Sequence, residues 1–406
     1  MGRAKEGGRY LRGAAAGIAL SLIPIVVTLI VADGMIRGIT DRYLELGTGH
    51  LQIYNYTFPS YPEEALDNIS DIKGIRGVWP ERHGMGVLVG RQGSQGATIR
   101  AVESSFWEDE GSLKFLSTVS GEAKIESDRE VLLGEALATS LGVEVGNSVR
   151  IMTISTGSEG KTLPRIRPFT VKGIVSSGYR ELDSLWCIMS LEAGKAFLSE
   201  TSESYLMLKI DDPYGGADTM AGLIDERLGS GFGVYTWKQL QRSQYSSYES
   251  TRQLLLFIMA LIVLVAAVNV SAATSMLVIE RRRDIAVLKA AGASPGFTGS
   301  IFLWGAILTG ALGSMAGLSA GLLIGVSVNS IIHSLEELLS FISGLFHGGS
   351  VKILDSGFYL ETIPIIIDWK AVCFIGVFTV LSSALSSWIP VRRAGKTKPV
   401  ETLRKY

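Results

Sequence analysis

The sequence is poor in charge, and this limits what kind of protein it encodes. Only 19% of the 406 residues are charged, whereas 47% are hydrophobic and the mean hydropathy is +0.30. This composition is too apolar for an ordinary soluble enzyme and too charged for a chain made only of membrane spans. We therefore expect a membrane part joined to a water-exposed domain. The net charge of −1 gives no indication of nucleic-acid binding.

Motifs for catalysis or metal binding are also lacking. The two cysteines, Cys187 and Cys373, lie in different contexts and are not expected to form a disulfide or a metal site. The segment 157–162 superficially resembles a phosphate loop, but the position five residues before Gly160 is Ser155 instead of glycine. The histidines are scattered along the chain at positions 50, 83, 333 and 347. We predict no active site, no metal and no cofactor in this chain.

Four long apolar segments predict four transmembrane helices. A span needs about 20 mostly apolar residues, and the stretches 13–31, 254–279, 290–332 and 371–388 qualify. The first stretch follows basic residues, as a signal peptide does, but it is longer than a signal core and no convincing cleavage site follows. Gly and Pro are absent from Val234 to Ala291. This favours one helix from Thr236 through the second span, with a break at the membrane surface as the alternative.

Basic residues orient these spans. Segments 1–13, 279–296 and 391–406 together carry fourteen Lys or Arg against four acids, a net charge of +10, whereas the rest of the chain carries −11. Because basic loops stay in the cytoplasm, both termini are predicted to be cytoplasmic. The predicted order is tail 1–12, span 13–34, periplasmic domain 35–250, span 251–279, cytoplasmic segment 280–296, span 297–332, periplasmic loop 333–369, span 370–390 and tail 391–406.

The sequence predicts a mixed α/β structure for the outer domain. β-branched and aromatic residues between glycine-rich turns predict strands at 50–54, 85–89, 97–102, 148–154, 169–175, 185–189 and 205–210. Helical patterns predict helices at 62–69, 134–141, 191–198 and 217–228.

Two features of the spans concern packing and polarity. In the third span a small residue recurs at every fourth position, which is typical of a close-packing helix face; these residues are Gly305, Thr309, Gly313, Gly317, Gly321 and Gly325. Asn269 lies near the middle of the second span, where a polar side chain is costly. It either bonds a neighbouring helix or lines a pathway.

The cytoplasmic segment predicts a short amphipathic helix over 281–291. Ile285, Leu288 and Lys289 fall on one helical face, and Gly292 is expected to end the helix. Such a helix suits the groove of a partner protein. A plain positive-inside anchor would explain the arginines but not the ordered apolar face.

This segment, from Glu280 through Arg282 to Ser294 (ERRRDIAVLKAAGAS), resembles the coupling helix of the FtsX/MacB superfamily of ABC permeases. The stretches 388–394 (WIPVRRA) and 399–403 (PVETL) look like its carboxyl-terminal signature. Segments 352–359 and 363–369, with 49–53, 131–135 and 141–146, resemble the lipoprotein-releasing permeases, the LolC/LolE family. The resemblance covers nearly the whole chain.

The resemblance implies the fold and the partners. Spans one and two would extend as a stalk bearing a periplasmic domain of two subdomains. Two permeases would pair above two copies of a LolD-like cytoplasmic ATPase, which binds the ATP and Mg²⁺. A lipoprotein would then pass to a LolA-like periplasmic carrier.

LolC-like members capture that carrier with a protruding loop, and residues 153–168 match it here. Its candidate contacts are Pro164, Arg165, Arg167 and Pro168. An ordinary solvated hairpin is the plain alternative, and the sequence does not decide between a LolC-like role, a LolE-like role and a homodimer. Two rival functions remain: a MacB-like efflux permease, and an FtsX-like transducer that activates a cell-wall hydrolase.

Overall fold

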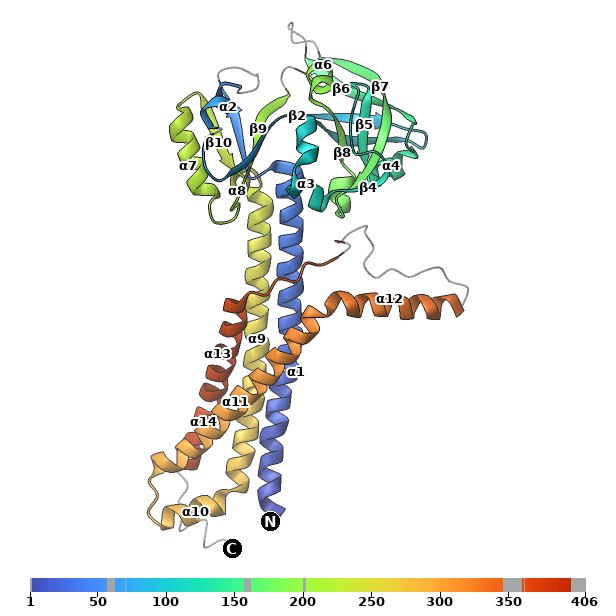
Figure 1. Cartoon of the computed structure of the whole chain (residues 1–406). Helices are drawn as coiled ribbons and strands as arrows, with labels where there is room; N and C mark the ends of the chain where they lie inside the picture. Colours follow the sequence, from blue (N-terminus) through green and yellow to red (C-terminus); the bar gives the residue numbers. More distant parts are fainter. Residues whose placement is uncertain are drawn as a thin grey trace. The chain divides into compact units, whose positions relative to one another are not determined.

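The computed structural model describes residues 2–56, 63–69, 71–156, 162–199, 202–345, 360 and 362–395 (Figure 1). The chain divides into two compact units. A helical unit comprises 1–36, 247–351 and 363–406, and a sheet unit comprises 37–246 and 352–362. Two long helices each contribute residues to both units; these are α1 (Gly2–Arg42) and α9 (Arg242–Glu280).

The helical unit contains the membrane spans. Within the described residues, four helical stretches are long and apolar enough to cross a bilayer, at 11–48, 242–280, 295–326 and 369–392. They belong to α1, α9, α11 (Pro295–Val326) and α13 (Trp369–Ser386), the last continuing into α14 (Trp388–Gly395). The four spans predicted from sequence are therefore confirmed. The described part of this unit also contains α10 (Arg282–Ala290) and α12 (Val328–Leu345).

Two predicted helix boundaries are wrong. The second span does not continue helically from Thr236, because a short helix α8 (Trp237–Leu240) ends at Gln241 and α9 then runs unbroken for 39 residues. The third span ends at Val326, not at Ile332. The apolar residues that follow belong to α12, which starts after a turn at Ser327.

In the part of the chain that the structure describes, the sheet unit is built on ten strands and short helices (Figure 1). The strands are β1 (Leu51–Asn55), β2 (Ile75–Val89), β3 (Ser94–Val102), β4 (Ser117–Gly121), β5 (Glu130–Gly134), β6 (Ser148–Thr156), β7 (Thr162–Ser176), β8 (Trp186–Ser190), β9 (Glu203–Ile210) and β10 (Phe232–Thr236). The helices are a π-helical turn η1 (Tyr43–Thr48), α2 (Glu63–Ile69), η2 (Ser104–Glu108), α3 (Glu110–Phe115), α4 (Glu135–Leu141), α5 (Arg180–Asp183), α6 (Leu191–Phe197) and α7 (Ala217–Leu228).

Strand pairing divides this unit into two lobes. β2, β3, β8, β5, β7 and β6 pair in succession, and β6 pairs with β2, so these strands close into a barrel. In the second lobe, β10, β1 and β9 extend from β2, and α2 and α7 pack on the strands. Each lobe has its own apolar core, around Leu133 and Ile151 in the barrel and around Ile53 and Leu208 in the other. This agrees with the two subdomains implied by the family resemblance.

All seven predicted strands lie on observed strands, and the mixed α/β class is confirmed. β4, β5 and β10 were missed. β5 reads EVLLG, a short apolar run that periodicity alone does not distinguish from a helical segment.

Candidate functional site

Helix α10 is the first candidate site, and its own ends explain its length. It follows α9 after a turn at Arg281. At its other end Gly292 has φ = 98°, a conformation that favours glycine. The amide of Gly292 donates to the Lys289 carbonyl and that of Ala293 to the Leu288 carbonyl, which is the Schellman arrangement that ends a helix. The prediction that Gly292 stops this helix is confirmed.

The apolar residues of α10 have separate roles. Ile285 is only 2% exposed and packs with Val278 of α9, Phe302 of α11 and Val391 of α14. Leu288, predicted on the same face, is 43% exposed. The prediction that Ile285 contacts the partner directly is therefore corrected. Ile285 is an anchor that fixes α10 to three helices of its own unit. Leu288 and its exposed neighbour Val287 remain available to a partner protein.

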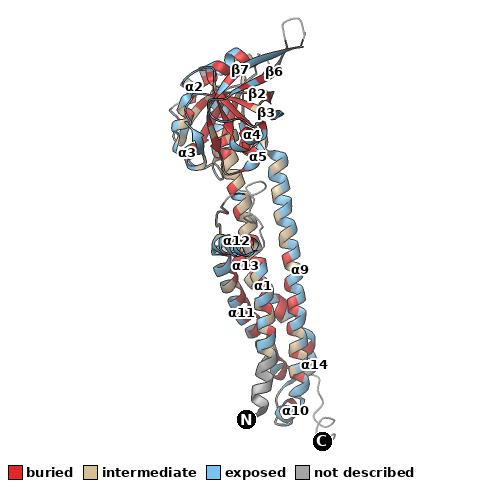
Figure 2. Cartoon of the chain, turned by 90° about the vertical axis from the view of Figure 1, so that its right-hand side faces the viewer, coloured by how far each residue is buried: buried red, intermediate tan, exposed pale blue. Residues whose placement is uncertain are grey.

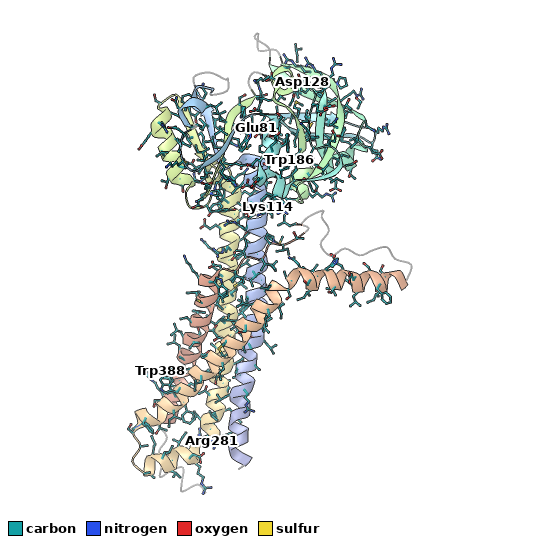
Figure 3. The ribbon with its side chains drawn as sticks, in the orientation of Figure 1. Glu81, Lys114, Asp128, Trp186, Arg281 and Trp388 are labelled. Atoms are coloured by element: carbon teal, nitrogen blue, oxygen red, sulfur yellow. The ribbon has the colours of Figure 1, made fainter. Side chains whose placement is uncertain are left out.

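Charged residues lie at both ends of α10. Glu280 ends α9 and Arg282 begins α10, and both are exposed. Arg281, labelled in Figure 3, pairs with Asp284 at 3.0 Å. Lys289 lies in the last turn, where its positive charge interacts favourably with the helix dipole.

The glycine stripe of α11 packs on α1. Alanine-like Cβ atoms built at Gly313 and Gly317 would lie 2.8–2.9 Å from the Ala15 carbonyl and from Ala19. The stripe continues at Gly321 and Gly325, where the nearest atoms belong to Val26 and Ile30 of α1. The prediction that Gly305 belongs to this packing face is wrong for the contacts within the chain, because a Cβ at Gly305 would meet no atom within 4 Å. Thr309 is buried and donates its hydroxyl to the Gly305 carbonyl. Gly310, not singled out from sequence, packs instead on Ser383 of α13.

Figure 2 shows that α9 carries both exposed and buried positions along its length. Asn269 is one of the exposed residues of this helix. Neighbouring positions on the same face, Val265 and Val268, are also exposed, whereas Ala266 and Val270 are buried. Asn269 therefore does not point into the packed helices of its own unit, and interhelical bonding within the chain is not its role.

An ion cluster that sequence reasoning missed joins three spans. Arg252 of α9 pairs with Asp33 of α1 at 3.0 Å and with Asp368 at 2.5 Å. Asp368 also caps α13 by accepting from the amides of Lys370 and Ala371. All three charges flank apolar runs, which is the signal that would have found them. Together they fix the ends of spans one, two and four to one another.

Buried charges connect the π-helical turn η1 to the strands of the sheet unit. Lys209 of β9 is fully buried, and its ammonium lies 2.6 Å from Asp109 and 3.2 Å from Glu45 of η1. Glu45 also meets Arg76 at 2.9 Å. Breaking a buried pair leaves an uncompensated charge and costs several kcal/mol. These charges therefore hold η1 firmly against the strands.

A second buried pair lies beside these charges. Arg100 donates to the Leu46 carbonyl of η1 and, at 2.6 Å, to Glu81 (labelled in Figure 3). Burial alone would raise the pKa of Glu81, but the charge of Arg100 and the hydrogen bonds from His83 and Arg100 lower it to about 2. Glu81 is thus a charged acceptor in the fold, not a proton donor.

The predicted carrier loop is mostly strand. β6 and β7 pair in register from Ser148 opposite Thr170 to Thr156 opposite Thr162, so most of 153–168 is an antiparallel hairpin. Its tip, residues 157–161, lies outside the described residues. Pro164, Arg165, Arg167 and Pro168 are all exposed on β7. The Arg167 guanidinium lies 5.8 Å from the ring centre of Phe197.

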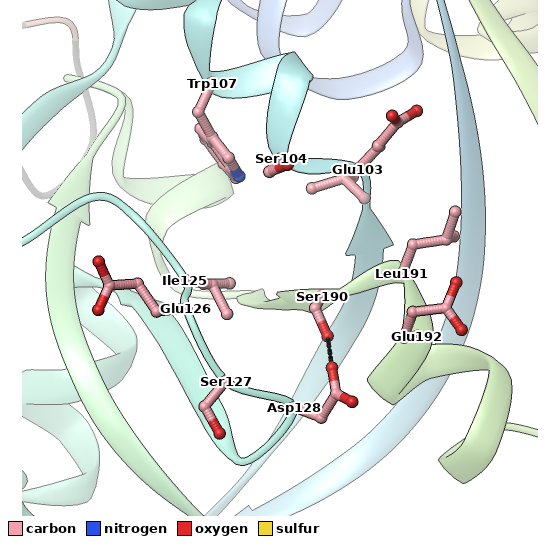
Figure 4. Close-up of a pocket in the computed structure, with 11 residues that line it drawn as sticks. Glu103, Ser104, Trp107, Ile125, Glu126, Ser127, Asp128, Ser190, Leu191 and Glu192 are labelled. Atoms are coloured by element: carbon pink, nitrogen blue, oxygen red, sulfur yellow. Dashed lines mark hydrogen bonds between the residues drawn. The ribbon is translucent and has the colours of Figure 1, made fainter.

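A cleft in the sheet unit is lined by acidic residues. Trp107, Ile125 and Leu191 line it together with exposed carboxylates, and Ser190 donates to Asp128 at 2.6 Å (Figure 4). Among the residues that the structure describes, no three His, Cys, Asp or Glu side chains are placed to hold a metal ion.

Two family models of membrane permeases match this chain. The family model of the MacB-like periplasmic core domain matches residues 13–224, and that of the FtsX-like permease C-terminal region matches 256–399. Because the first match alone covers more than half of the chain, this chain belongs to the family of permeases with a MacB-like periplasmic core domain.

Curated relatives extend over almost the full length. The chain is 28% identical over 396 residues to the lipoprotein-releasing system transmembrane protein LolC of Neisseria meningitidis, covering 96% of this chain and 92% of that protein. It is 22% identical to LolE of Haemophilus influenzae, covering 97% and 93%. An uncharacterized ABC transporter permease of Methanocaldococcus jannaschii is also 22% identical, covering 96% and 92%. The resemblance to LolC and LolE expected from the sequence is confirmed.

Proposed function

We propose that this chain is the permease subunit of an ABC transporter that releases lipoproteins from the bacterial inner membrane to a periplasmic carrier. The observation that carries the proposal is the similarity to LolC and LolE proteins along 96–97% of the chain. That similarity includes both the spans and the sheet unit, so it is not confined to a shared membrane architecture.

The charge pattern supplies the orientation. The basic segments 1–13, 279–296 and 391–406 favour a cytoplasmic position for both termini and for α10. The sheet unit then lies in the periplasm. An ATPase subunit is expected beneath α10, and two copies of a LolD-like protein would hold the ATP and Mg²⁺.

Movement of the ATPase would enter the permease through α10. Leu288 and Val287 offer an exposed apolar surface to the ATPase, while Ile285 fixes α10 to α9, α11 and α14. A push on α10 is therefore transmitted to the spans instead of bending a loop. Because α1 and α9 are unbroken helices, they transmit it onward as a mechanical stalk.

Release of a lipoprotein needs this energy. Exposing acyl chains to water costs about 0.8 kcal/mol per CH₂ group, so a multiply acylated protein does not leave the membrane without an energy source and an apolar acceptor. A second permease subunit, identical or related, would complete the transporter. Asn269 on the outward face of α9 suits contact with that subunit or with the pathway between the two.

The β6–β7 hairpin is the proposed carrier contact. Arg165 and Arg167 are exposed on β7 and offer positive charge to an acidic carrier surface. Such charges mainly raise the rate of association.

Depletion of the chain in its host tests the function. Lipoproteins destined for the outer membrane should accumulate in the inner membrane fraction as the permease disappears. Normal lipoprotein sorting, accompanied by a defect in cell-wall hydrolysis or in drug efflux, would contradict the proposal and favour an FtsX-like or MacB-like role.

A further inference from the structure

Helix α12 has a strongly one-sided surface that the proposed function does not use. Its 18 residues place the apolar side chains on one arc and the polar ones on the opposite arc. The apolar arc consists of Val328, Ile331, Ile332, Leu335, Leu338, Leu339, Phe341 and Ile342. The polar arc includes Asn329, His333, Glu336, Glu337 and Ser340.

The apolar arc is exposed within its own unit. Phe341 is 71% exposed and Leu338 is 54% exposed, and Ile331, Leu335 and Ile342 are each more than 40% exposed. Figure 1 shows α12 turning away from the axis of α11 and running across the direction of α13. A helix of a water-soluble protein buries such a face against the protein, so this face is built for another apolar surface.

The polar side of α12 forms hydrogen bonds with the segment that precedes span four. Asn329 donates its side-chain amide to the Ile363 carbonyl at 2.8 Å, and its oxygen accepts from the Ile363 amide at 3.3 Å. These bonds fix the start of α12 to the segment that leads into span four. Because Asn329 lies on the polar arc, they turn the apolar arc away from that segment.

The apolar arc also continues an exposed apolar surface at the end of span three. Span three ends at Val326, and α12 starts one residue after the turn at Ser327. Leu323 and Val326 at the end of the span are 72% and 47% exposed. The arc therefore begins beside apolar side chains of the span that face away from the packed helices.

We propose that α12 is an interfacial helix that lies in the bilayer surface, with its apolar arc sunk among the lipid acyl chains beside the end of span three. An interfacial helix inserts its apolar face to the boundary between headgroups and acyl chains. Residues 328–345 include no Lys or Arg, so burial of apolar area holds the helix there instead of attraction to anionic lipid. The inference goes beyond lipoprotein release and requires only that the four spans lie in a membrane.

Spin labels on the full-length chain in liposomes test this placement. Cys373 is replaced by serine, and buried Cys187 is retained because it is inaccessible to the label. Single cysteines are introduced at Leu338 and Ile342 on the apolar arc and at His333 and Glu337 on the polar arc. All four positions are exposed in the fold, so the labels disturb no packing.

The expected result is a reversal between the two arcs. Labels at 338 and 342 should collide more often with oxygen, which concentrates in lipid, and labels at 333 and 337 more often with a water-soluble nickel chelate. The pattern should be the same in phosphatidylcholine liposomes and in liposomes containing phosphatidylglycerol. Collisions with nickel at all four positions would place α12 in water and overturn the proposal. Low collision rates with both reagents at 338 and 342 would also overturn it, because they would show that protein, such as a second copy of the chain, covers the arc.

Discussion

Replacing Gly317 with alanine tests how tightly span three is held against span one. The added Cβ would lie 2.9 Å from three atoms, the Ala19 Cα, the Ala19 carbonyl oxygen and the Leu22 Cβ. Carbon atoms pack favourably at about 3.5–4.0 Å. Two of the three atoms are backbone, so no side-chain rotation relieves the clash and α1 must move away as a helix by about 0.6 Å or more. Overpacking of this kind costs about 1–3 kcal/mol.

Gly305→Ala is the matched control on the same helix. A Cβ at Gly305 meets no atom within 4 Å, and both substitutions share the gain in helix propensity of up to about 1 kcal/mol. The difference in stability between the two variants therefore reports the packing contribution alone. Thermal unfolding in detergent, followed by circular dichroism, should show a lower Tm for Gly317→Ala, by about 2–4 °C per kcal/mol, and an unchanged or slightly higher Tm for Gly305→Ala. Equal Tm values for the two variants would refute the packing argument.

Three further predictions concern coupling, acid stability and carrier binding. Leu288→Asp should abolish stimulation of the partner ATPase without affecting membrane insertion, and normal stimulation would exclude α10 as the coupling element. The pKa of Glu81 falls from 4.5 in the unfolded chain to about 2 in the fold, so its contribution to the free energy of unfolding is complete above pH 4.5 and is lost between pH 4.5 and 2. Glu81→Gln should therefore make the free energy of unfolding depend less on pH in that window. An unchanged dependence on pH would contradict this role of Glu81. The double variant Arg165→Glu/Arg167→Glu should slow carrier association, most strongly at low salt, and an unaltered rate would leave the hairpin without this role.

The spans were predictable because bilayer thickness fixes their length and composition. Local rules also sufficed where one residue decides the outcome, as Gly292 does by ending α10. The same rules failed at the end of span three. Val328, Ile331 and Ile332 continue the apolar run, and only the turn at Ser327 shows that they belong to a different helix.

Contacts between distant residues were beyond the sequence. Ile285 and Leu288 share one helical face, yet one is buried and the other exposed, because Phe302 and Val391 arrive from elsewhere in the chain. Likewise, Lys209 lies in an apolar strand far from Glu45, and only the fold brings their charges to 3.2 Å. Charge and periodicity predict which residues are unusual but not which of them meet.

ATP-dependent transfer of a labelled lipoprotein tests the central claim most directly. The chain is reconstituted in proteoliposomes with its ATPase and its second permease subunit, and a soluble periplasmic carrier is added outside. The account predicts that the lipoprotein appears on the carrier only when ATP is hydrolysed, and that Leu288→Asp prevents the transfer. A lipoprotein that stays in the membrane while the wild-type complex hydrolyses ATP at its full rate would contradict the account.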